Sequence, residues 1–398
     1  MDFNLEPARQ VIVNRVREYV DREIVPLEPA FLESGFAALL PVLRTRRADV
    51  KKQGLWGPVY PREHGGLGLD LLTYGLVSEA LGRSPLAHYV FGANAPDAGN
   101  VELLHEAATP PQKKQWLDPL VSGEIRSCFA MTEPDSSGAN PLMMTTRAQC
   151  DGDGWVLDGR KWFATGADGA SLCIVMAVSD PGAAPRERTS LFLVPTDAPG
   201  YRLLRNIPVM GHTGADLFSH GEVAFEHCRV PATALLGKRG EGFRLAQARL
   251  GPGRIHHCMR WLGICDRAQE MMIARAATRV IGPDARRLGD SDIVRAWIAE
   301  CAAEISAARL LVLHTAWRIL HAGARAVRAD ISMIKFHVAA VLQRVLDRAL
   351  QVHGGLGVTD DTLLAWFYRE ERAARIYDGP DEVHKIAVAK RLLEPRSG

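Results

Sequence analysis

The chain of 398 residues has no uninterrupted apolar run of the roughly 18 residues that a membrane-crossing helix needs. Its longest such run, Leu172 to Val178, has the length of a strand. The N-terminus carries early acidic residues, Asp2 and Glu6, and no apolar segment of the signal-peptide type. These absences predict a cytoplasmic protein without a membrane span.

Paired-cysteine patterns are also missing, because the seven cysteines are an odd number and form no Cys-x-x-Cys motif. A disulfide framework is therefore not expected, and a reducing compartment fits better. The adjacent His256, His257 and Cys258 have metal-binding side chains. Neighbouring residues of a helix point about 100° apart, however, so we predict packing there and no metal site.

Charge of one sign is lacking too: 48 Lys and Arg against 46 Asp and Glu leave a formal charge of +2. No basic tract of five or more residues occurs, so we expect no nucleic-acid partner. The sequence has no GxxxxGK[ST] phosphate loop, and Gly240-Glu241-Gly242 lacks the third glycine of the dinucleotide fingerprint. With 47% hydrophobic residues the composition is that of a globular protein, which excludes whole-chain disorder.

Residues 1–126 have a helical pattern broken by proline and glycine. Two segments, 36–54 and 71–82, end at glycine, which is a common helix stop. A further helix is predicted from Pro110, with Thr109 as its N-cap. We therefore expect an N-terminal helical domain over residues 1–126.

Residues 127–235 differ in character, because short β-branched segments alternate there with turn residues. Asp151-Gly152-Asp153-Gly154 is typical of a hairpin turn. No helical segment separates the strands, which argues for an antiparallel sandwich or barrel rather than a parallel sheet with crossover helices. The expected strands lie at 144–150, 155–162, 172–178, 189–195, 201–206 and 221–231.

Residues 236–398 return to a helical pattern, in which apolar residues recur at three- and four-residue steps from Val294 to Ile319 and from Val338 to Ala349. The second pattern is interrupted at His353 to Gly357. Long amphipathic helices of this kind favour a helix bundle. The chain is thus predicted to be an α+β protein in the order helices, strands, helices.

Four segments together carry a resemblance to a known family: FAMTEPDSSGAN (129–140), GRKWFATGA (159–167), RLGPGRIHHCMRWLG (249–263) and QVHGGLGVTDD with RIYDGPDEVHK (351–385). With PREHGGLGLD at 61–70, they resemble the acyl-CoA dehydrogenase family over nearly the whole chain. GPGRIHHCMR and DGPDEVH are similar to the branch whose larger members carry a kinase-like domain, for which this chain has no room. The resemblance implies an N-terminal helical domain, a central antiparallel β-barrel or sandwich and a C-terminal four-helix bundle.

The resemblance also implies noncovalently bound FAD. Phe163 stands where the family usually has a tryptophan against the flavin. Phenylalanine retains an aromatic face at this position but lacks the indole N–H. Arg279 matches the arginine that meets the FAD pyrophosphate, although its usual Phe-Gly-Lys sequel is missing, and Gln351, Gly354 and Gly355 match the segment that reaches the FAD of a neighbouring subunit. The implied cofactor-binding residues are Phe129, Met131, Thr132, Phe163, Ala164, Thr165, Arg279, Gln351, Gly354, Gly355, Pro380 and Glu382.

Removal of the α-proton of a thioester needs a base, and a carboxylate in an apolar cavity suits that task. The family commonly has a glutamate in a string similar to IYEGT, and here Asp378 takes its place in IYDGP. Other members supply the base from the residue before an arginine, but the residue before Arg254 is Gly253. The resemblance assigns Arg254, Gly379 and Ser137 to the substrate. Ala139-Asn140 replaces a serine-aspartate pair expected beside the pantetheine.

The function implied is the α,β-dehydrogenation of an acyl-CoA to a trans-2-enoyl-CoA, with an electron-transferring flavoprotein as electron acceptor and a homodimer or homotetramer as the assembly. Two alternatives stay open. One is a flavin oxidase of the same fold with a non-CoA substrate, similar to nitroalkane oxidase, which also uses an aspartate base. The other is a catalytically silent member of the family. The length and branching of the acyl chain cannot be read from the sequence.

Overall fold

The computed structural model describes residues 6–394, apart from the side chains of residues 250–252. The chain forms two compact units. The helical unit comprises Met1–Gly35, Leu69–Val90 and Pro252–Gly398, and the sheet unit comprises Phe36–Gly68 and Phe91–Gly251. The helices are α1 (Pro7–Tyr19), α2 (Glu28–Lys52), α3 (Leu71–Gly82), α4 (Ala87–Val90), α5 (Asp97–Ala107), α6 (Pro110–Gln112), α7 (Asp118–Ser122), α8 (Gly242–Thr278), α9 (Asp292–Ala322), α10 (Arg328–His353), α11 (Leu363–Glu371) and α12 (Asp381–Leu393).

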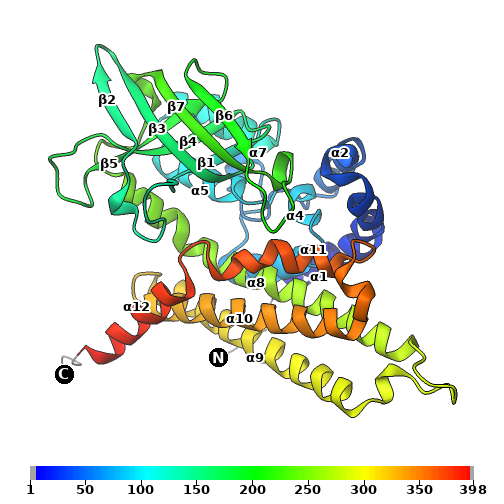
Figure 1. Cartoon of the computed structure of the whole chain (residues 1–398). Helices are drawn as coiled ribbons and strands as arrows, with labels where there is room; N and C mark the ends of the chain where they lie inside the picture. Colours follow the sequence, from blue (N-terminus) through cyan, green and yellow to red (C-terminus); the bar gives the residue numbers. More distant parts are fainter. Residues whose placement is uncertain (1–5, 395–398) are drawn as a thin grey trace. The chain divides into compact units, whose positions relative to one another are not determined.

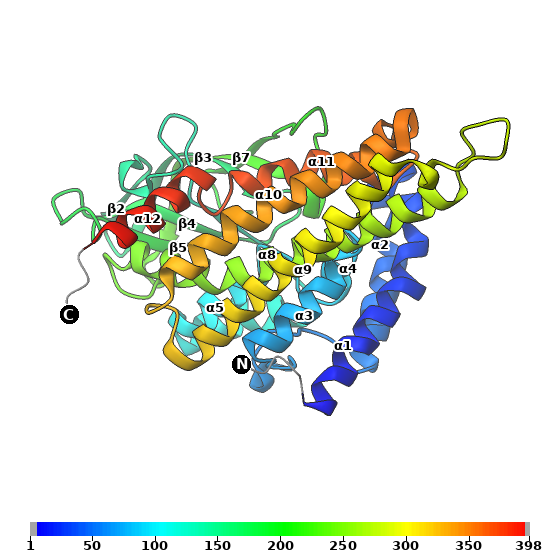
Figure 2. The ribbon, with the colours of Figure 1, turned by 90° about the horizontal axis from the view of Figure 1, so that it is seen from below.

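The helical unit is built from long helices that lie side by side, with α3 packed on α9, α9 on α10 and α10 on α12 (Figure 2). The Asp70 side chain caps α3 by accepting hydrogen bonds from the amides of Leu72 and Thr73, each at 3.1 Å. The predicted helix 71–82 coincides with α3, and α10 ends at His353, where the predicted interruption begins. One face of α10 supplies its buried apolar residues: Ile331, Ile334, Val338, Val341, Leu342, Val345, Leu346 and Ala349.

Glycines bring α3 and α8 into close contact. A Cβ at Gly263 of α8 would collide with the carbonyl oxygen of Glu79, and a Cβ at Gly82 of α3 would collide with that of Arg260. Only glycine permits this approach of two backbones. The crossing therefore fixes the position of the GRIHHCMRWLG segment within the helical unit.

The sheet unit contains eight strands in the order β6-β7-β3-β2-β4-β5-β8, with β1 paired to β4 (Figure 1). Three expected strands, β4 to β6, have the predicted bounds, and Gly152 turns the β2–β3 hairpin with φ +62°. The Thr109 cap also forms, as a capping box with Gln112. The strands are β1 (Ser127–Ala130), β2 (Arg147–Asp151), β3 (Gly154–Thr165), β4 (Leu172–Val178), β5 (Thr189–Pro195), β6 (Tyr201–Asn206), β7 (His220–Pro231) and β8 (Leu235–Leu236).

The prediction of a purely antiparallel sheet is wrong at β4, which pairs in parallel with β1 and with the start of β2. The chain leaves β1 and passes through the β2–β3 hairpin before it enters β4. The chain reverses once in that hairpin and once more between β3 and β4, so β4 runs in the direction of β1 without a crossover helix. The sheet is therefore mixed.

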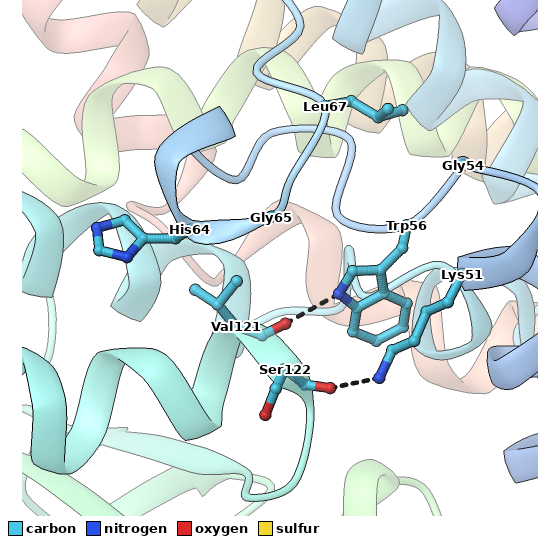
Figure 3. A pocket seen from close by; sticks show the side chains of 8 residues that line it. All are labelled: Lys51, Gly54, Trp56, His64, Gly65, Leu67, Val121 and Ser122. Carbon is cyan, nitrogen blue, oxygen red and sulfur yellow. Dashed lines mark hydrogen bonds between the residues drawn. The ribbon is translucent and has the colours of Figure 1, made fainter.

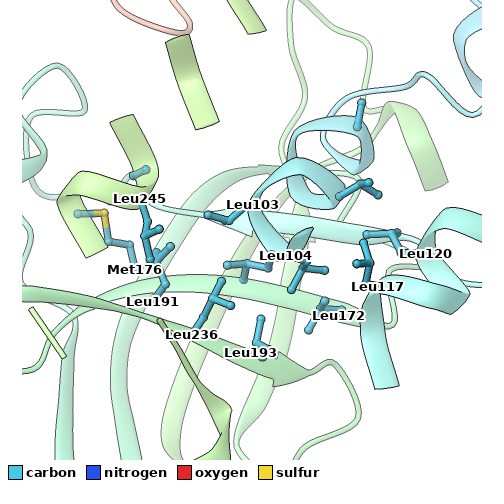
Figure 4. Packing of buried hydrophobic residues seen from close by; sticks show 14 of the residues in the cluster. Leu103, Leu104, Leu117, Leu120, Leu172, Met176, Leu191, Leu193, Leu236 and Leu245 are labelled. Atoms are coloured by element: carbon cyan, nitrogen blue, oxygen red, sulfur yellow. The ribbon is translucent and has the colours of Figure 1, made fainter. Parts of the chain in front are cut away.

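The core of the sheet unit forms where one face of β4 and β5 packs against α5, α7 and the first turns of α8 (Figure 4). Leu172, Met176, Leu191 and Leu193 contribute from the strands, and Leu104 is among the residues contributed by the helices. β4 is buried along its whole length, since every residue from Leu172 to Val178 is inaccessible or nearly so. This explains why it reads as a continuous apolar run and not as an alternating strand.

The helical stretch Pro7–Lys52 passes a length and composition test for membrane crossing, with a window of mean hydropathy 1.2 of which 28% is buried. Gly35 breaks the helical backbone inside it, with φ 76° and ψ 173°. The core helix of a globular protein passes the same test. The absence of a membrane span stays a prediction.

Candidate functional site

The loop between α11 and α12 carries Asp378, in a backbone conformation that L-residues rarely adopt. Asp378 has φ +54° and the following Gly379 has φ +101°. A Cβ at Gly379 would clash with the ring of His384, so glycine is required there on two grounds. Pro380 then stands at the N-cap of α12. A left-handed non-glycine residue beside such a glycine marks a backbone that its surroundings hold in place.

Asp378 is fixed at its carboxylate and at its carbonyl. Oδ2 lies 3.0 Å from Nε2 of His257 on α8, and both side chains are largely buried, with 20% and 17% exposed. The carbonyl oxygen accepts hydrogen bonds from Nε and Nη2 of Arg254, at 3.4 and 3.3 Å, and lies 3.1 Å from Nε2 of His384. The structure thus brings the predicted residues Asp378 and Arg254 together, and it adds two histidines.

The protonation of His384 follows from its surroundings. Burial and the positive charge of Arg254 lower the pKa of His384 to about 4, so the ring is neutral at pH 7. The carbonyl of Asp378 can only accept, so Nε2 of His384 carries the proton and donates it. Nδ1 then accepts from the Ser332 hydroxyl, at 3.2 Å. The neutral ring is thus held between α10 and the loop.

Lys335 holds the next carbonyl of the loop, because its ammonium donates to the oxygen of Gly379 at 2.7 Å. Burial lowers the pKa of Lys335 to about 8, although the negative charges of Asp381 and Asp378 oppose the shift. Asp381 lies 3.9 Å away and also accepts from Arg375 at 2.7 Å. Three helices therefore supply donors to two consecutive carbonyls: Arg254 from α8, Lys335 from α10 and His384 from α12.

Tyr377 anchors the loop on its other side. Its hydroxyl accepts hydrogen bonds from Nη2 of Arg260 at 2.8 Å and from the indole of Trp261 at 2.9 Å. Arg260 also pairs with Glu371 at the end of α11. Burial raises the pKa of Tyr377 well above its ordinary value, so the phenol stays neutral. This cluster ties α8 to the residue before Asp378.

In the sheet unit, hydrogen bonds join the two segments expected to hold the flavin ring. The Thr132 hydroxyl donates to the carbonyl of Trp162 at 2.8 Å, and the amide of Trp162 donates to the carbonyl of Thr132 at 3.1 Å. Lys161 donates to the carbonyl of Met131 at 2.8 Å. The residues Met131 and Thr132 are therefore fixed directly to β3, the strand that carries Phe163 to Thr165.

A buried ion pair beneath this junction was not predicted. Nζ of Lys161 lies 2.9 Å from Oε1 of Glu133, and their side chains are 0% and 3% exposed. Glu133 also accepts from the amide and hydroxyl of Thr145, at 2.7 and 2.8 Å, and from the amide of Thr146 at 2.8 Å. Lys161 and these donors lower the pKa of Glu133 to about 2 although burial opposes them, and burial lowers the pKa of Lys161 to about 8 although Glu133 opposes it.

Phe163 leaves β3 at an irregularity, where the register with β7 shifts between Lys161 and Ala164. Its φ is +51° and its side chain is 45% exposed, so the ring faces outward from the sheet unit. Ala164 is fully buried, and the Thr165 hydroxyl lies 3.0 Å from Nδ1 of His220. A bulge of this kind re-aims a side chain, and here it presents an aromatic face.

Of the remaining predicted residues, Ser137 lines a small hollow together with Met131 and Thr132. Phe129 is on β1 beneath the guanidinium of Arg249, at 4.4 Å. In the helical unit, Glu382 is exposed in the first turn of α12. Exposed residues also include Arg279 after the end of α8, Gln351, Gly354 and Gly355 around the end of α10, and Ser137 in the loop after β1.

Three family descriptions match consecutive segments of the chain. The N-terminal domain of acyl-CoA dehydrogenases matches residues 6–124, the middle domain matches 128–228 and the C-terminal domain matches 240–393. The chain belongs to the acyl-CoA dehydrogenase family. The family was predicted from four short segments, and the matches extend over nearly the whole chain.

Among relatives, the chain is 42% identical over 356 residues to FadE2 of Mycobacterium tuberculosis, which is named as an acyl-CoA dehydrogenase, covering 89% of this chain and 86% of FadE2. It is 37% identical over 399 residues to acyl-CoA dehydrogenase family member 11 of Mus musculus, covering 98% of this chain but 51% of the mouse protein. The chain thus spans about half the length of that relative.

Solved structures of the acyl-CoA dehydrogenase family share the fold. A family protein of Mycobacterium abscessus aligns with a TM-score of 0.93 at 38% identity, covering 98% of this chain and 99% of that one. A glutaryl-CoA dehydrogenase of Mycobacterium smegmatis, solved with FADH2, aligns with a TM-score of 0.84 at 25% identity, covering 98% and 95%. The order of an N-terminal helical domain, a middle sheet domain and a C-terminal helical domain is therefore confirmed.

The residues present fit the FAD that an acyl-CoA dehydrogenase implies. Phe163 offers an exposed aromatic face, and the oxygen of Thr132 still has lone pairs to accept a hydrogen bond after donating to Trp162. In the helical unit, a Cβ at Gly354 or Gly355 would meet nothing within 4 Å, so the backbone there is open to close approach by a phosphate or ribityl chain. The exposed guanidinium of Arg279 has the charge for a pyrophosphate.

A pocket of about 350 Å³ in the sheet unit is lined by eight residues, none of which is predicted for the site (Figure 3). It lies between the end of α2, the loop that contains His64, Gly65 and Leu67, and α7. Lys51 donates to the carbonyl of Ser122 at 2.6 Å, and Trp56 donates to that of Val121 at 2.9 Å. Because these bonds join α2 and the loop that follows it to α7, the pocket belongs to the packing of the sheet unit.

Residues that could hold a metal occur at one place in the described part of the chain. Glu63, His64 and His105 have ligand atoms within 4.8 Å of one another. The adjacent His256 and His257 point to different partners instead: Nδ1 of His256 lies 2.8 Å from the Ser78 hydroxyl, and His257 meets Asp378. Divergence of neighbouring helical residues was the reason for predicting no metal there.

Proposed function

We propose that this chain is an FAD-dependent acyl-CoA dehydrogenase, in which Asp378 removes the α-proton of an acyl-CoA thioester. The observation that carries the proposal is the position of Asp378, a largely buried carboxylate on a loop that is held by donors from three helices. A largely buried carboxylate suits a group that must accept a proton, because burial disfavours the charged form. Arg254 and Lys335 hold the carbonyls of Asp378 and Gly379, and these hydrogen bonds would keep the Asp378 carboxylate in one place during turnover.

In the proposed reaction, the Cα–H bond breaks, the proton moves to the Asp378 carboxylate and the electron pair stays on the substrate as an enolate. The amide of Asp378 would donate to the thioester oxygen, a contact that strengthens as the enolate charge develops. Bound FAD would supply the acceptor for the hydride that leaves the β-carbon. Arg254 and Gly379, next to the base, and Ser137 in the sheet unit would position the acyl-CoA.

Phe129, Met131, Thr132, Phe163, Ala164 and Thr165 would hold the flavin ring, and Gly354, Gly355, Gln351 and Arg279 the remainder of FAD, with Pro380 and Glu382 beside the base. The complex of the related glutaryl-CoA dehydrogenase with FADH2 supports this choice of cofactor. We further propose a cytoplasmic homodimer or homotetramer that passes electrons to an electron-transferring flavoprotein. The likeness to family member 11 supports placing the chain in that branch.

The proposal is tested by anaerobic titration of the purified yellow protein with straight and branched acyl-CoAs. We expect at least one to bleach the flavin absorbance. Asp378→Asn should retain flavin and fold but lose reduction by several orders of magnitude, because no other base would take the α-proton. A wild-type protein that every acyl-CoA leaves oxidised would refute the function, and residual activity within about tenfold of wild type in Asp378→Asn would refute the base.

A second candidate is a flavin oxidase with a non-CoA substrate, and one observation favours it. Asn140, which replaces the aspartate expected beside the pantetheine, accepts from the amide of Leu142 at 3.3 Å and caps a short 3₁₀ turn. The Asn140 side chain is therefore used in a local hydrogen bond, which makes it less suited to bind the pantetheine of CoA. Peroxide release in air with a nitroalkane, combined with no bleaching by acyl-CoAs, would favour the oxidase.

A further inference from the structure

His257 of the helical unit meets the proposed base at its carboxylate. Its Nε2 lies 3.0 Å from Oδ2 of Asp378. The ring stacks on Trp261, with centroids 6.1 Å apart and 24° between planes, and meets Tyr377 edge-on at 5.5 Å. The ring of His257 is therefore immobilised by packing, and it contacts the Asp378 carboxylate, whose orientation matters for proton abstraction.

The hydrogen bonds of His257 indicate which nitrogen carries its proton. Nδ1 is buried and has no hydrogen-bond partner in the described part of the chain. An imidazolium would leave a buried N–H donor unsatisfied at Nδ1, which costs more than an unused acceptor. The neutral ring with its proton on Nε2 satisfies the contact with Asp378, because a carboxylate can only accept.

Several charged and titratable groups surround His257. From α8 it faces His256 and Arg260, from α4 it interacts with His88, and from the loop it faces Tyr377 and Asp378.

We infer that His257 is the positioning residue of the base: its neutral ring donates from Nε2 to Oδ2 of Asp378 and fixes the direction of the carboxylate. This inference rests on the proposed function. During proton abstraction the substrate proton joins the Asp378 carboxylate, while His257 keeps its own proton on Nε2. No proton leaves the pair until the product does.

Such a partner has a clear physical purpose at this position. An aspartate reaches one methylene less far than the glutamate usual in the family, and its backbone is left-handed here. A carboxylate that rotates away from the Cα–H bond loses rate steeply, because misplacement by about 1 Å can cost about 100-fold. A donor on one oxygen selects a single rotamer and also stabilises the anion that acts as base.

The activity test compares His257→Phe with His257→Gln. Phenylalanine keeps the stacking on Trp261 but removes the donor, and we expect flavin reduction by acyl-CoA to slow about 10- to 100-fold. The acidic limb of the pH–rate profile should move to higher pH, since the anion loses a donor. Glutamine can donate an N–H, so His257→Gln should recover to within about tenfold of wild type.

His321→Phe is a matched control, because His321 also stacks on a tryptophan four residues away on its helix, with Trp317 at 4.2 Å and 29°. It should leave both the rate and the pH profile unchanged. If His257 had a packing role alone, His257→Phe would change thermal stability or flavin content without moving the acidic limb. An unmoved limb with a rate within threefold of wild type would overturn the inference.

A second readout does not depend on turnover. With ¹⁵N-labelled histidine, the wild-type oxidised flavoprotein should show, besides the ring of His384, a neutral Nε2–H ring whose proton exchanges slowly and whose signal is absent in His257→Phe. The signal should also be lost in Asp378→Gly, a substitution that suits the positive φ and keeps the loop. Survival of the signal in Asp378→Gly would overturn the contact. If no acyl-CoA bleaches the flavin of the wild type, the proposed function is refuted. The NMR spectrum would still decide whether His257 contacts Asp378.

Discussion

The two partners of the buried Lys161–Glu133 pair should respond very differently to mutation. Glu133 keeps three hydrogen-bond donors from Thr145 and Thr146 when Lys161 is removed. Lys161 has, among the described residues, one further oxygen acceptor, the carbonyl of Met131. Removing Glu133 therefore leaves a buried ammonium with most of its compensation gone, whereas removing Lys161 leaves a carboxylate that is still solvated by the backbone.

The magnitudes follow from these partners. Breaking a buried pair so that a charge is left behind costs about 3–5 kcal/mol, which we expect for Glu133→Gln. Deprotonation of the lysine limits the loss, because neutralising an ordinary lysine at pH 7 costs about 5 kcal/mol. Lys161→Met should cost about 1–3 kcal/mol, the range for a buried acceptor that loses one of several partners. The double variant should be more stable than Glu133→Gln alone.

The assay is urea unfolding of the flavin-loaded protein at pH 7, with the flavin content measured for each variant. Glu226→Gln is the control, since Glu226 pairs with Arg202 at 3.0 Å on the same sheet but both side chains are more than half exposed. That substitution should cost less than about 1 kcal/mol. The reasoning is refuted if Lys161→Met destabilises more than Glu133→Gln, or if adding Lys161→Met to Glu133→Gln brings no gain.

Two further predictions concern the helical unit. The pKa of His384 is about 4 in the folded protein and 6.5 ordinarily, so the unfolded chain binds this proton first as the pH falls. The free energy of unfolding should therefore drop between pH 6.5 and 4, by at most about 1.4 kcal/mol per pH unit. His384→Gln should flatten that slope in chemical denaturation. Gly263→Ala should destabilise by about 1–3 kcal/mol through the clash with Glu79. Gly253→Ala on the same helix, where a Cβ meets nothing within 4 Å, should be neutral or stabilising in the same thermal melt.

The sequence predicted the local parts of the fold and missed a pairing between distant segments. The bounds of β4, β5 and β6 could be read because turn residues flank each of them, and α3 because Gly82 ends its apolar pattern. The parallel pairing of β1 with β4 joins segments more than 40 residues apart along the chain. Periodicity within either segment carries no information about its partner, so an absence of helices suggested antiparallel pairing throughout.

The same division holds for the site. Asp378 could be predicted because its string resembles the family motif, but His257 and His384 lie on α8 and α12, and their convergence on one residue depends on helix packing. The sequence predicts packing for both His256 and His257, and both rings do pack against aromatic side chains, but His257 also contacts Asp378. A usable signal existed for Lys161, which is a charged residue at an inward-facing position of an otherwise alternating strand.

The hydrogen bonds at the loop explain how an aspartate can serve where the family usually has a longer glutamate. A non-glycine residue with positive φ costs about 1 kcal/mol or more, and it persists where other contacts determine the backbone. Here Arg254 and His384 hold the carbonyl of Asp378, and Lys335 holds that of Gly379. The backbone therefore sets where the short side chain starts, and His257 sets where it points. A glutamate reaches the substrate with an extra methylene, whereas here the position of the loop would bring the shorter aspartate close enough. Asp378→Glu should therefore place its carboxylate beyond the donor on His257 and lower the rate of flavin reduction.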